Sequence, residues 1–195
     1  MSKVSYQRGF TLVELLVTIA IISLLLGMVV VNFRTSEQSS AVNLGTEHLA
    51  GALREIQNYS LAQKRIVVDA SVPDGVIPPG GYGLEISVKQ NSYLLYADLD
   101  NVPGFKKGID YLIRTENLPT DAVLENIFSD DAKPTRADIV FTAPNGAMDI
   151  YLTPSVLPPG QSATSADLQV CLKNSDCGFQ RMINLERDGS LINIE

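Results

Sequence analysis

The sequence predicts an α+β fold, in which one long N-terminal helix is followed by a β-rich head with mostly antiparallel strands. An apolar run extends from Phe10 to Phe33, and residues 34–62 contain no proline and keep a helical spacing of apolar residues. After residue 63, short apolar stretches alternate with turn residues. The predicted organisation is therefore a membrane helix over residues 10–33, an amphipathic continuation over 34–62 and a head over 63–195.

The apolar run is long enough to cross a membrane. Its only residues that are not clearly hydrophobic are Thr11, Glu14, Thr18, Ser23, Gly27 and Asn32. A spanning helix needs about 20 apolar residues. Lys3 and Arg8 precede the run, and this positive charge places the N-terminus in the cytoplasm. The alternative is a secretory signal peptide cleaved after the small residues 39–41, but the apolar part of such peptides is only about 7–15 residues long.

Glu14 is the one ionisable residue inside this run. A carboxylate at the centre of a spanning helix costs about 2.5–3.5 kcal/mol on insertion scales, so it indicates a function and a partner. The alternative is that Glu14 lies close enough to the start of the helix to reach the interface or to be protonated. Composition leaves both interpretations open.

The segment RGFTLVELLV, from Arg8 to Val17, resembles the class III signal sequence of type IV pilins and type II secretion pseudopilins. The resemblance implies that a prepilin peptidase removes the leader, residues 1–9, by cutting between Gly9 and Phe10, and that it methylates the new amino group of Phe10. It also implies that Glu14 faces the N-terminal amine of a neighbouring subunit during assembly, and a buried charge is tolerable when it is paired.

One position departs from the family pattern. Many pilins have a proline near the end of this helix, where this chain has Val31. The kink or local melting that the proline brings is therefore not expected.

The resemblance implies a structural subunit, a pseudopilin or minor pilin, of a type II secretion pseudopilus or a type IV pilus. Its partners would be prepilin peptidase, other pilin or pseudopilin subunits and an inner-membrane assembly platform, and no cofactor is implied. It would cross the bacterial inner membrane once, with the head in the periplasm or outside the cell. Four further stretches are similar to the GspH/FimT group: residues 49–65, 96–112, 139–146 and 181–192.

The alternative function is a minor pilin for DNA uptake (competence) or adhesion. Some FimT-type pilins bind DNA through a basic tail after their last glycine, but here Gly189 is followed by SLINIE, which has no arginine. The net charge is −7, and DNA binding depends on cationic contacts to phosphates. Nucleic acid is therefore not an expected partner.

Residues 34–62 have one apolar face. The residues predicted to form it are Val42, Leu49, Leu53 and Ile56. Gly45 and Gly51 are expected to weaken the helix by about 1 kcal/mol each relative to Ala. His48 is the only histidine, and without a second histidine or a nearby cysteine it is interpreted as an ordinary surface or packing residue.

No enzyme signature is found. The sequence has no GxSxG, HExxH or P-loop pattern, so no catalytic role is expected.

The candidate strands are 66–68, 82–88, 92–97, 111–114, 122–127, 138–142, 148–153, 168–173, 182–187 and 191–194. A tight turn is predicted at Gln90-Asn91, and Asp188-Gly189 is a strong hairpin signal. Residues 157–167 are predicted to form a polar loop.

Three carboxylates near a turn, Asp98, Asp100 and Asp110, form a weak calcium candidate, because Ca²⁺ binds oxygen ligands at alternate positions. The Val-Pro pair at 102–103 breaks this series, and the lysines at 106–107 add positive charge. A solvated hairpin turn is the favoured interpretation, and no metal site is predicted.

Cys171 and Cys177 are the only cysteines, with five residues between them. In an exported chain this pair indicates a disulfide that closes a small loop. A zinc site would need more ligands than two cysteines and one distant histidine.

Overall fold

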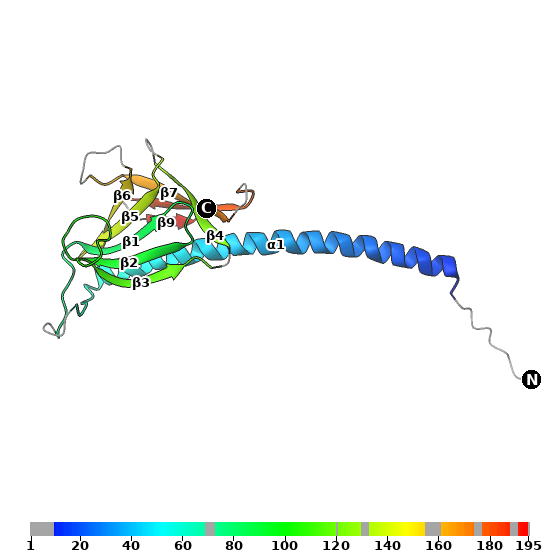
Figure 1. Cartoon of the computed structure of the whole chain (residues 1–195), viewed down its shortest axis with the longest axis horizontal. Helices are drawn as coiled ribbons and strands as arrows, with labels where there is room; N and C mark the ends of the chain where they lie inside the picture. Colours follow the sequence, from blue (N-terminus) through cyan, green and yellow to red (C-terminus); the bar gives the residue numbers. More distant parts are fainter. Residues whose placement is uncertain are drawn as a thin grey trace, which may run out of the picture. The chain divides into compact units, whose positions relative to one another are not determined.

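The computed structural model describes residues 10–68, 73–119, 121–129, 133–154, 161–173, 177–187 and 191–194. The described elements are the helix α1 (Leu12–Leu61) and the strands that follow it (Figure 1). The chain divides into two compact units, Met1–Gln38 and Ser39–Glu195. The first unit contains the apolar part of α1, and the second contains the rest of α1 together with all the described strands.

The strands form two antiparallel sheets. Their bounds are β1 Gly81–Ser87, β2 Ser92–Asp98, β3 Tyr111–Asn117, β4 Ala122–Phe128, β5 Arg136–Thr142, β6 Ala147–Thr153, β7 Ser165–Leu172, β8 Gln180–Glu186 and β9 Leu191–Ile194. The five-stranded sheet has the order β3-β2-β1-β5-β6, and the four-stranded sheet has the order β4-β7-β8-β9. The α+β class with antiparallel sheet is confirmed, whereas the division into two sheets was not predicted.

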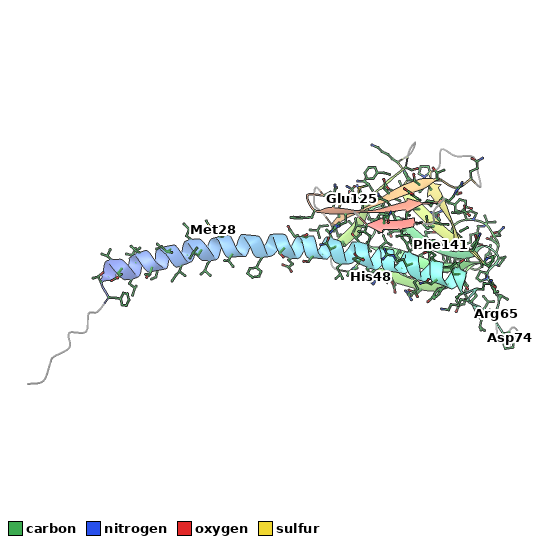
Figure 2. The ribbon with its side chains drawn as sticks, turned by 180° about the vertical axis from the view of Figure 1, so that it is seen from behind. Met28, His48, Arg65, Asp74, Glu125 and Phe141 are labelled. Atoms are coloured by element: carbon green, nitrogen blue, oxygen red, sulfur yellow. A yellow bond between two sulfur atoms is a disulfide. The ribbon has the colours of Figure 1, made fainter. Side chains whose placement is uncertain are left out.

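The second half of α1 lies against both sheets. All four residues of the predicted apolar face, Val42, Leu49, Leu53 and Ile56, are at most 1% exposed. Leu49, Leu53 and Ile56 share one core with residues of both sheets, such as Phe141 of β5 (Figure 2) and Leu168 of β7. Burying each of these side chains contributes about 1.5–3 kcal/mol. This is why the second compact unit begins within the helix, at Ser39, rather than at its end.

Gly45 is located where the helix approaches β4 of the four-stranded sheet closely. A Cβ atom added at Gly45 would lie 2.6 Å from Cβ of Ala122 on β4. At Gly51, which is exposed on the same helix, an added Cβ would meet nothing within 4 Å. Gly45 therefore allows the close approach of helix and strand, a role that helix propensity alone does not reveal.

The predicted strand at 66–68 is wrong. Ile66 makes only an isolated bridge with Val76, through two backbone hydrogen bonds of 2.9 and 2.8 Å. Val67 and Val68 are 54% and 38% exposed. No sheet face covers these two valines, so they do not form a strand despite their high β propensity.

Two loop predictions also need correction. The tight turn after β1 lies at Val88-Lys89 rather than Gln90-Asn91: Gln90 N–H donates to the carbonyl of Ser87, and Lys89 has φ 62°. The backbone of Gln90 is engaged elsewhere, because its carbonyl accepts from Leu124 of the other sheet.

The predicted polar loop at 157–167 ends earlier than expected. Residues 165–167 belong to β7, because Ala166 is buried and Ser165 pairs with Glu186. The hairpin signal Asp188-Gly189 lies outside the described residues, although the strands on either side of it, β8 and β9, do pair antiparallel.

Candidate functional site

The helix α1 begins with a side-chain cap. The hydroxyl oxygen of Thr11 accepts a hydrogen bond of 3.2 Å from the backbone N–H of Glu14, and the Thr11 carbonyl accepts from Leu15. A threonine followed three residues later by glutamate is the capping-box pattern, which satisfies free N–H groups at a helix start. This role of Thr11 was missed by the sequence analysis, although its T-x-x-E spacing is visible there.

The predicted processing site lies immediately before this cap. Phe10 is 82% exposed, and Gly9 lies outside the described residues. The window Leu12–Val29 has a mean hydropathy of 2.6, and none of it is buried inside the molecule. The hydroxyl of Thr18 donates to the carbonyl of Leu15 at 2.8 Å, so this polar group is satisfied within the helix. Length and composition therefore fit a membrane anchor.

Glu14 is at the third helical position, with its side chain exposed. Among the described residues, no ion pair involves Glu14. A negative charge in the first turn is stabilised by the helix dipole, by about 0.3–1 kcal/mol at exposed sites. That is less than the insertion cost of about 2.5–3.5 kcal/mol. The local geometry therefore does not by itself explain a carboxylate at this position in a membrane helix.

The three carboxylates of the acidic turn are brought together, with one oxygen of each within 4.8 Å of the others. However, Asp98 and Asp110 are only 3% and 7% exposed, so the predicted solvated turn is wrong. Their oxygens organise the loop: Asp98 accepts from the N–H groups of residues 100 and 101, and Asp110 from those of residues 99 and 106. Buried carboxylates are retained here because backbone donors satisfy them.

Lys106 completes this turn. Its ammonium lies 2.7 Å from the Asp100 carboxylate, which holds the pKa of Asp100 below its ordinary value. Burial raises the pKa of Asp98, against the hydrogen bond from Asn101. The calcium alternative stays a prediction, and the contacts within the turn explain the cluster without a metal.

His48 has neighbours that the sequence did not reveal. Its Nδ1 lies 2.9 Å from the hydroxyl of Tyr93 on β2, and that hydroxyl donates to Glu116 of β3 at 2.6 Å. A tyrosine has one hydroxyl hydrogen, and an ionised carboxylate can only accept. Because Tyr93 donates its hydrogen to Glu116, Nδ1 of His48 is assigned as the donor to the Tyr93 hydroxyl.

A second part of the same network joins the helix to β3. The guanidinium of Arg114 contacts both carboxylate oxygens of Glu55 on α1, and its Nε lies 2.7 Å from Glu116. Tyr59 also donates to Glu55, and the ammonium of Lys64 lies 3.5 Å from the centre of the Tyr59 ring. These contacts hold α1 against the outer strands of the five-stranded sheet.

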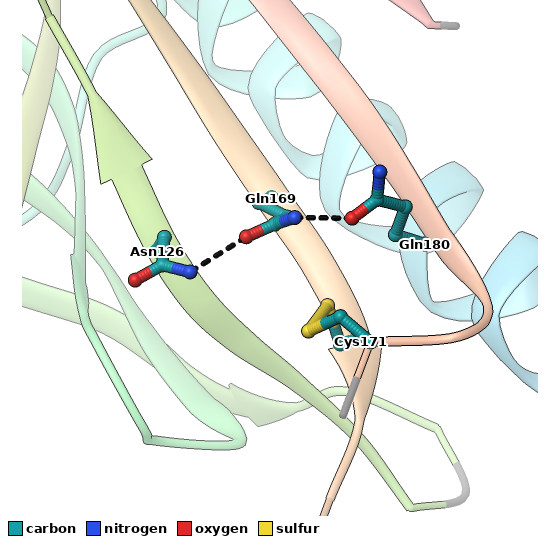
Figure 3. The surroundings of a disulfide bond; sticks show 5 residues. Asn126, Gln169, Cys171 and Gln180 are labelled. Atoms are coloured by element: carbon teal, nitrogen blue, oxygen red, sulfur yellow. Dashed lines mark hydrogen bonds between the residues drawn. A yellow bond between two sulfur atoms is a disulfide. The ribbon is translucent and has the colours of Figure 1, made fainter. Parts of the chain in front are cut away.

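The disulfide lies on the four-stranded sheet (Figure 3). Cys171 on β7 is bonded to Cys177, as the sequence indicated, with 5.3 Å between their Cα atoms. Beside it, side-chain amides form a row across three strands: Asn126 donates to Gln169, and Gln169 donates to Gln180. The amide row joins β4, β7 and β8, and the disulfide ties the end of β7 to the segment before β8.

Comparison with known proteins finds one family model that matches part of the chain. Residues 4–30 match the family described as the prokaryotic N-terminal methylation motif. The match covers the predicted processing site, Glu14 and the whole apolar window Leu12–Val29. Searches of curated proteins and of solved structures find no match. The motif supports a pilin or pseudopilin subunit that is anchored by its N-terminal helix.

Proposed function

We propose that this chain is a structural subunit, a pseudopilin or minor pilin of the GspH/FimT type, that joins a helical filament through its N-terminal helix. The observation that carries the proposal is the methylation motif at residues 4–30, which includes the apolar window of α1, and none of the residues in that window is buried inside the molecule. Prepilin peptidase cuts between Gly9 and Phe10 and methylates Phe10. Neighbouring subunits then cover the apolar surface, and the amine of Phe10 pairs with Glu14 of a neighbour.

The compartment follows from the same features. The basic leader stays in the cytoplasm, and the head is exported to the periplasm or the cell exterior. The disulfide supports this orientation, because disulfides persist in oxidising compartments. The proposal includes no catalytic role.

Mass spectrometry of the protein purified from its native membrane tests the processing step. We expect a chain that begins at a methylated Phe10. A chain that retains residues 1–9, or one cut after Ala41 as a secretory signal peptide would be, would overturn the proposal.

The competing DNA-uptake function is separated by an electrophoretic mobility shift of the full chain in detergent micelles, at low and moderate salt. We expect no shift, because the net charge is −7 and residues 191–195 contain no cation. Salt-sensitive binding would favour the DNA-uptake function instead.

A further inference from the structure

A second group of buried charges lies on the face of the five-stranded sheet that carries Tyr96. Tyr96 is fully buried, and its ring lies against Phe105, with 5.8 Å between the ring centres. A Cβ added at Gly104 would lie 3.4 Å from Arg136 and 3.6 Å from the Asp138 carboxylate. The loop of residues 99–110, which joins β2 to β3, therefore covers these side chains through Gly104 and Phe105.

Two carboxyl groups face each other beneath this loop. Glu85 on β1 and Asp138 on β5 are direct cross-strand partners, and their side chains are 16% and 2% exposed. Like charges at such positions are destabilising. Among the described residues, the cation that pairs with them is Arg136, whose Nε lies 3.3 Å from Asp138 and whose Nη1 lies 3.8 Å from Glu85. One guanidinium faces two carboxyl groups.

Two carboxyl oxygens that lack a hydrogen bond show where a proton fits. Oε2 of Glu85 and Oδ1 of Asp138 are buried and have no hydrogen-bond partner among the described residues. Two ionised carboxylates cannot satisfy each other, because each can only accept. A single proton turns one of them into a donor and satisfies both. Burial raises the pKa of Asp138 to about 7, against Arg136 and with a further contribution from Glu85.

Tyr96 also faces the pair, and its buried hydroxyl has no hydrogen-bond partner among the described residues. The other charged and titratable groups around the pair are already engaged or lie farther along the same face. They are Asp98 at the end of β2, Asp100, Lys106 and Asp110 on the loop, and Asp149 and Tyr151 on β6. The loop carboxylates bind loop N–H groups or Lys106, and Asp149 accepts from Ser162. None of these contacts supplies a second cation for Glu85 and Asp138.

We propose that Glu85 and Asp138 share one proton and act as a pH-sensitive latch on the loop 99–110. With the proton in place, the pair carries one negative charge, which Arg136 balances, and the loop packs over Tyr96. When the proton leaves to solvent, two negative charges face one guanidinium, and the loop opens to admit water. The loop also carries Val102 and Ile109, which are 44% and 53% exposed.

The direction of the effect follows from proton linkage. Between the ordinary pKa of an aspartate, about 4, and about 7, the folded state holds a proton that the unfolded state has lost. Stability therefore falls as pH rises through this range, and the fall is complete above the folded-state pKa of Asp138. The head is exported in the proposed function, but the latch itself depends only on the contacts described above.

Amide hydrogen exchange of the full chain in detergent micelles tests the latch, at about pH 5 and about pH 9, with the rates corrected for intrinsic chemistry. In the wild type we expect the loop 99–110 to open roughly tenfold more often at the higher pH. In Asp138→Asn the amide supplies the missing donor at every pH, so this difference should vanish. Asp74→Asn, which changes an exposed carboxylate elsewhere, should behave as the wild type does.

Infrared spectroscopy gives a second measurement. A protonated carboxyl band should be present at the lower pH, disappear at the higher pH and be missing from Asp138→Asn. If that variant fails to fold, Glu85→Gln serves instead, because it also removes one of the two charges and should also abolish the pH difference. Equal loop opening at both pH values in the wild type, or a pH difference that survives both substitutions, would overturn the latch.

Discussion

Glu14 combines two roles at the start of α1, one local and one between subunits. Its backbone N–H is capped by Thr11, and its carboxylate lies in the first turn, where the helix dipole favours negative charge. The local contribution is small beside the cost of a carboxylate in a spanning helix. Most of the compensation for this cost must therefore come from a partner outside the chain. The amine of a neighbouring Phe10 has the required charge.

Substitution of Glu14 separates these two roles. Glu14→Gln keeps the side-chain length and the capping-box pattern but removes the charge. We expect membrane insertion to become easier, the head to stay folded and incorporation into filaments to fall, as measured by the share of the protein in a sheared filament fraction. Glu37→Gln, an exposed change farther along α1, is the matched control. Normal incorporation of Glu14→Gln would remove the pairing role.

Gly45 and Gly51 form a second matched pair at the scale of single residues. Gly45→Ala would place a methyl group 2.6 Å from Cβ of Ala122, and this overpacking should lower the free energy of unfolding by about 1–3 kcal/mol. Gly51→Ala meets nothing within 4 Å and should raise it by up to about 1 kcal/mol. Thermal unfolding of the full chain measures both. If the two substitutions shift the unfolding temperature in the same direction, the close approach at Gly45 does not govern packing.

At the scale of elements, α1 is attached to the five-stranded sheet in two ways. Its apolar face is buried in the core, and its edge carries the contact from His48 to β2 and the contact from Glu55 to β3, while Tyr59 donates to Glu55 within the helix. The charged side chains of Glu55 and Arg114 are 31% and 37% exposed, so solvent screens their attraction. Packing therefore supplies most of the stability of this contact, whereas the polar network fixes where the helix lies along the strands.

The Glu55–Arg114 pair makes the stability of the fold depend on pH in the acidic range. Burial alone would raise the pKa of Glu55, but the hydrogen bonds from Arg114 and Tyr59 outweigh it and lower the pKa below its ordinary value. The stabilisation is present above that ordinary value and is lost as pH falls through the lowered one. Glu55→Gln should therefore cost about 0.5–1 kcal/mol at neutral pH and almost nothing in acid. Chemical denaturation at both pH values measures the difference, and the exposed Glu47→Gln is the control. An equal cost at both pH values would contradict the role of the charge.

At the scale of the whole molecule, the features that depend on local sequence pattern could be predicted. The features that depend on tertiary contacts could not. The apolar face of α1 follows from helical period, and the disulfide from two cysteines in an exported chain. By contrast, nothing in the sequence near His48 indicates Tyr93 or Glu116, because strands far along the chain bring them together. The pairing of Glu85 with Asp138 depends in the same way on the β1–β5 register. The isolated bridge at Ile66 shows the opposite error, since β propensity alone suggested a strand.

The division into two units has a direct consequence for folding. Among the described residues, every buried side chain lies at Val42 or later, so the apolar window contributes nothing to the core of the head. A shortened chain of residues 39–195 should therefore fold without detergent and unfold within a few degrees of the full chain. A chain of residues 63–195 should not fold, because it lacks the helix residues Val42, Leu49, Ala50, Ala52, Leu53 and Ile56, which are buried in the core. At about 1.5–3 kcal/mol for each large apolar side chain, this loss approaches the total stability of a small domain, about 5–15 kcal/mol.

Near-ultraviolet circular dichroism and thermal unfolding of the two shortened chains check this expectation. A cooperative transition for residues 39–195 and none for residues 63–195 would assign the second half of α1 to the head and leave the first half free for assembly. If residues 63–195 folded cooperatively, the helix would be an addition to a complete domain. If residues 39–195 failed to fold, the apolar half of α1 would be needed for folding as well as for anchoring.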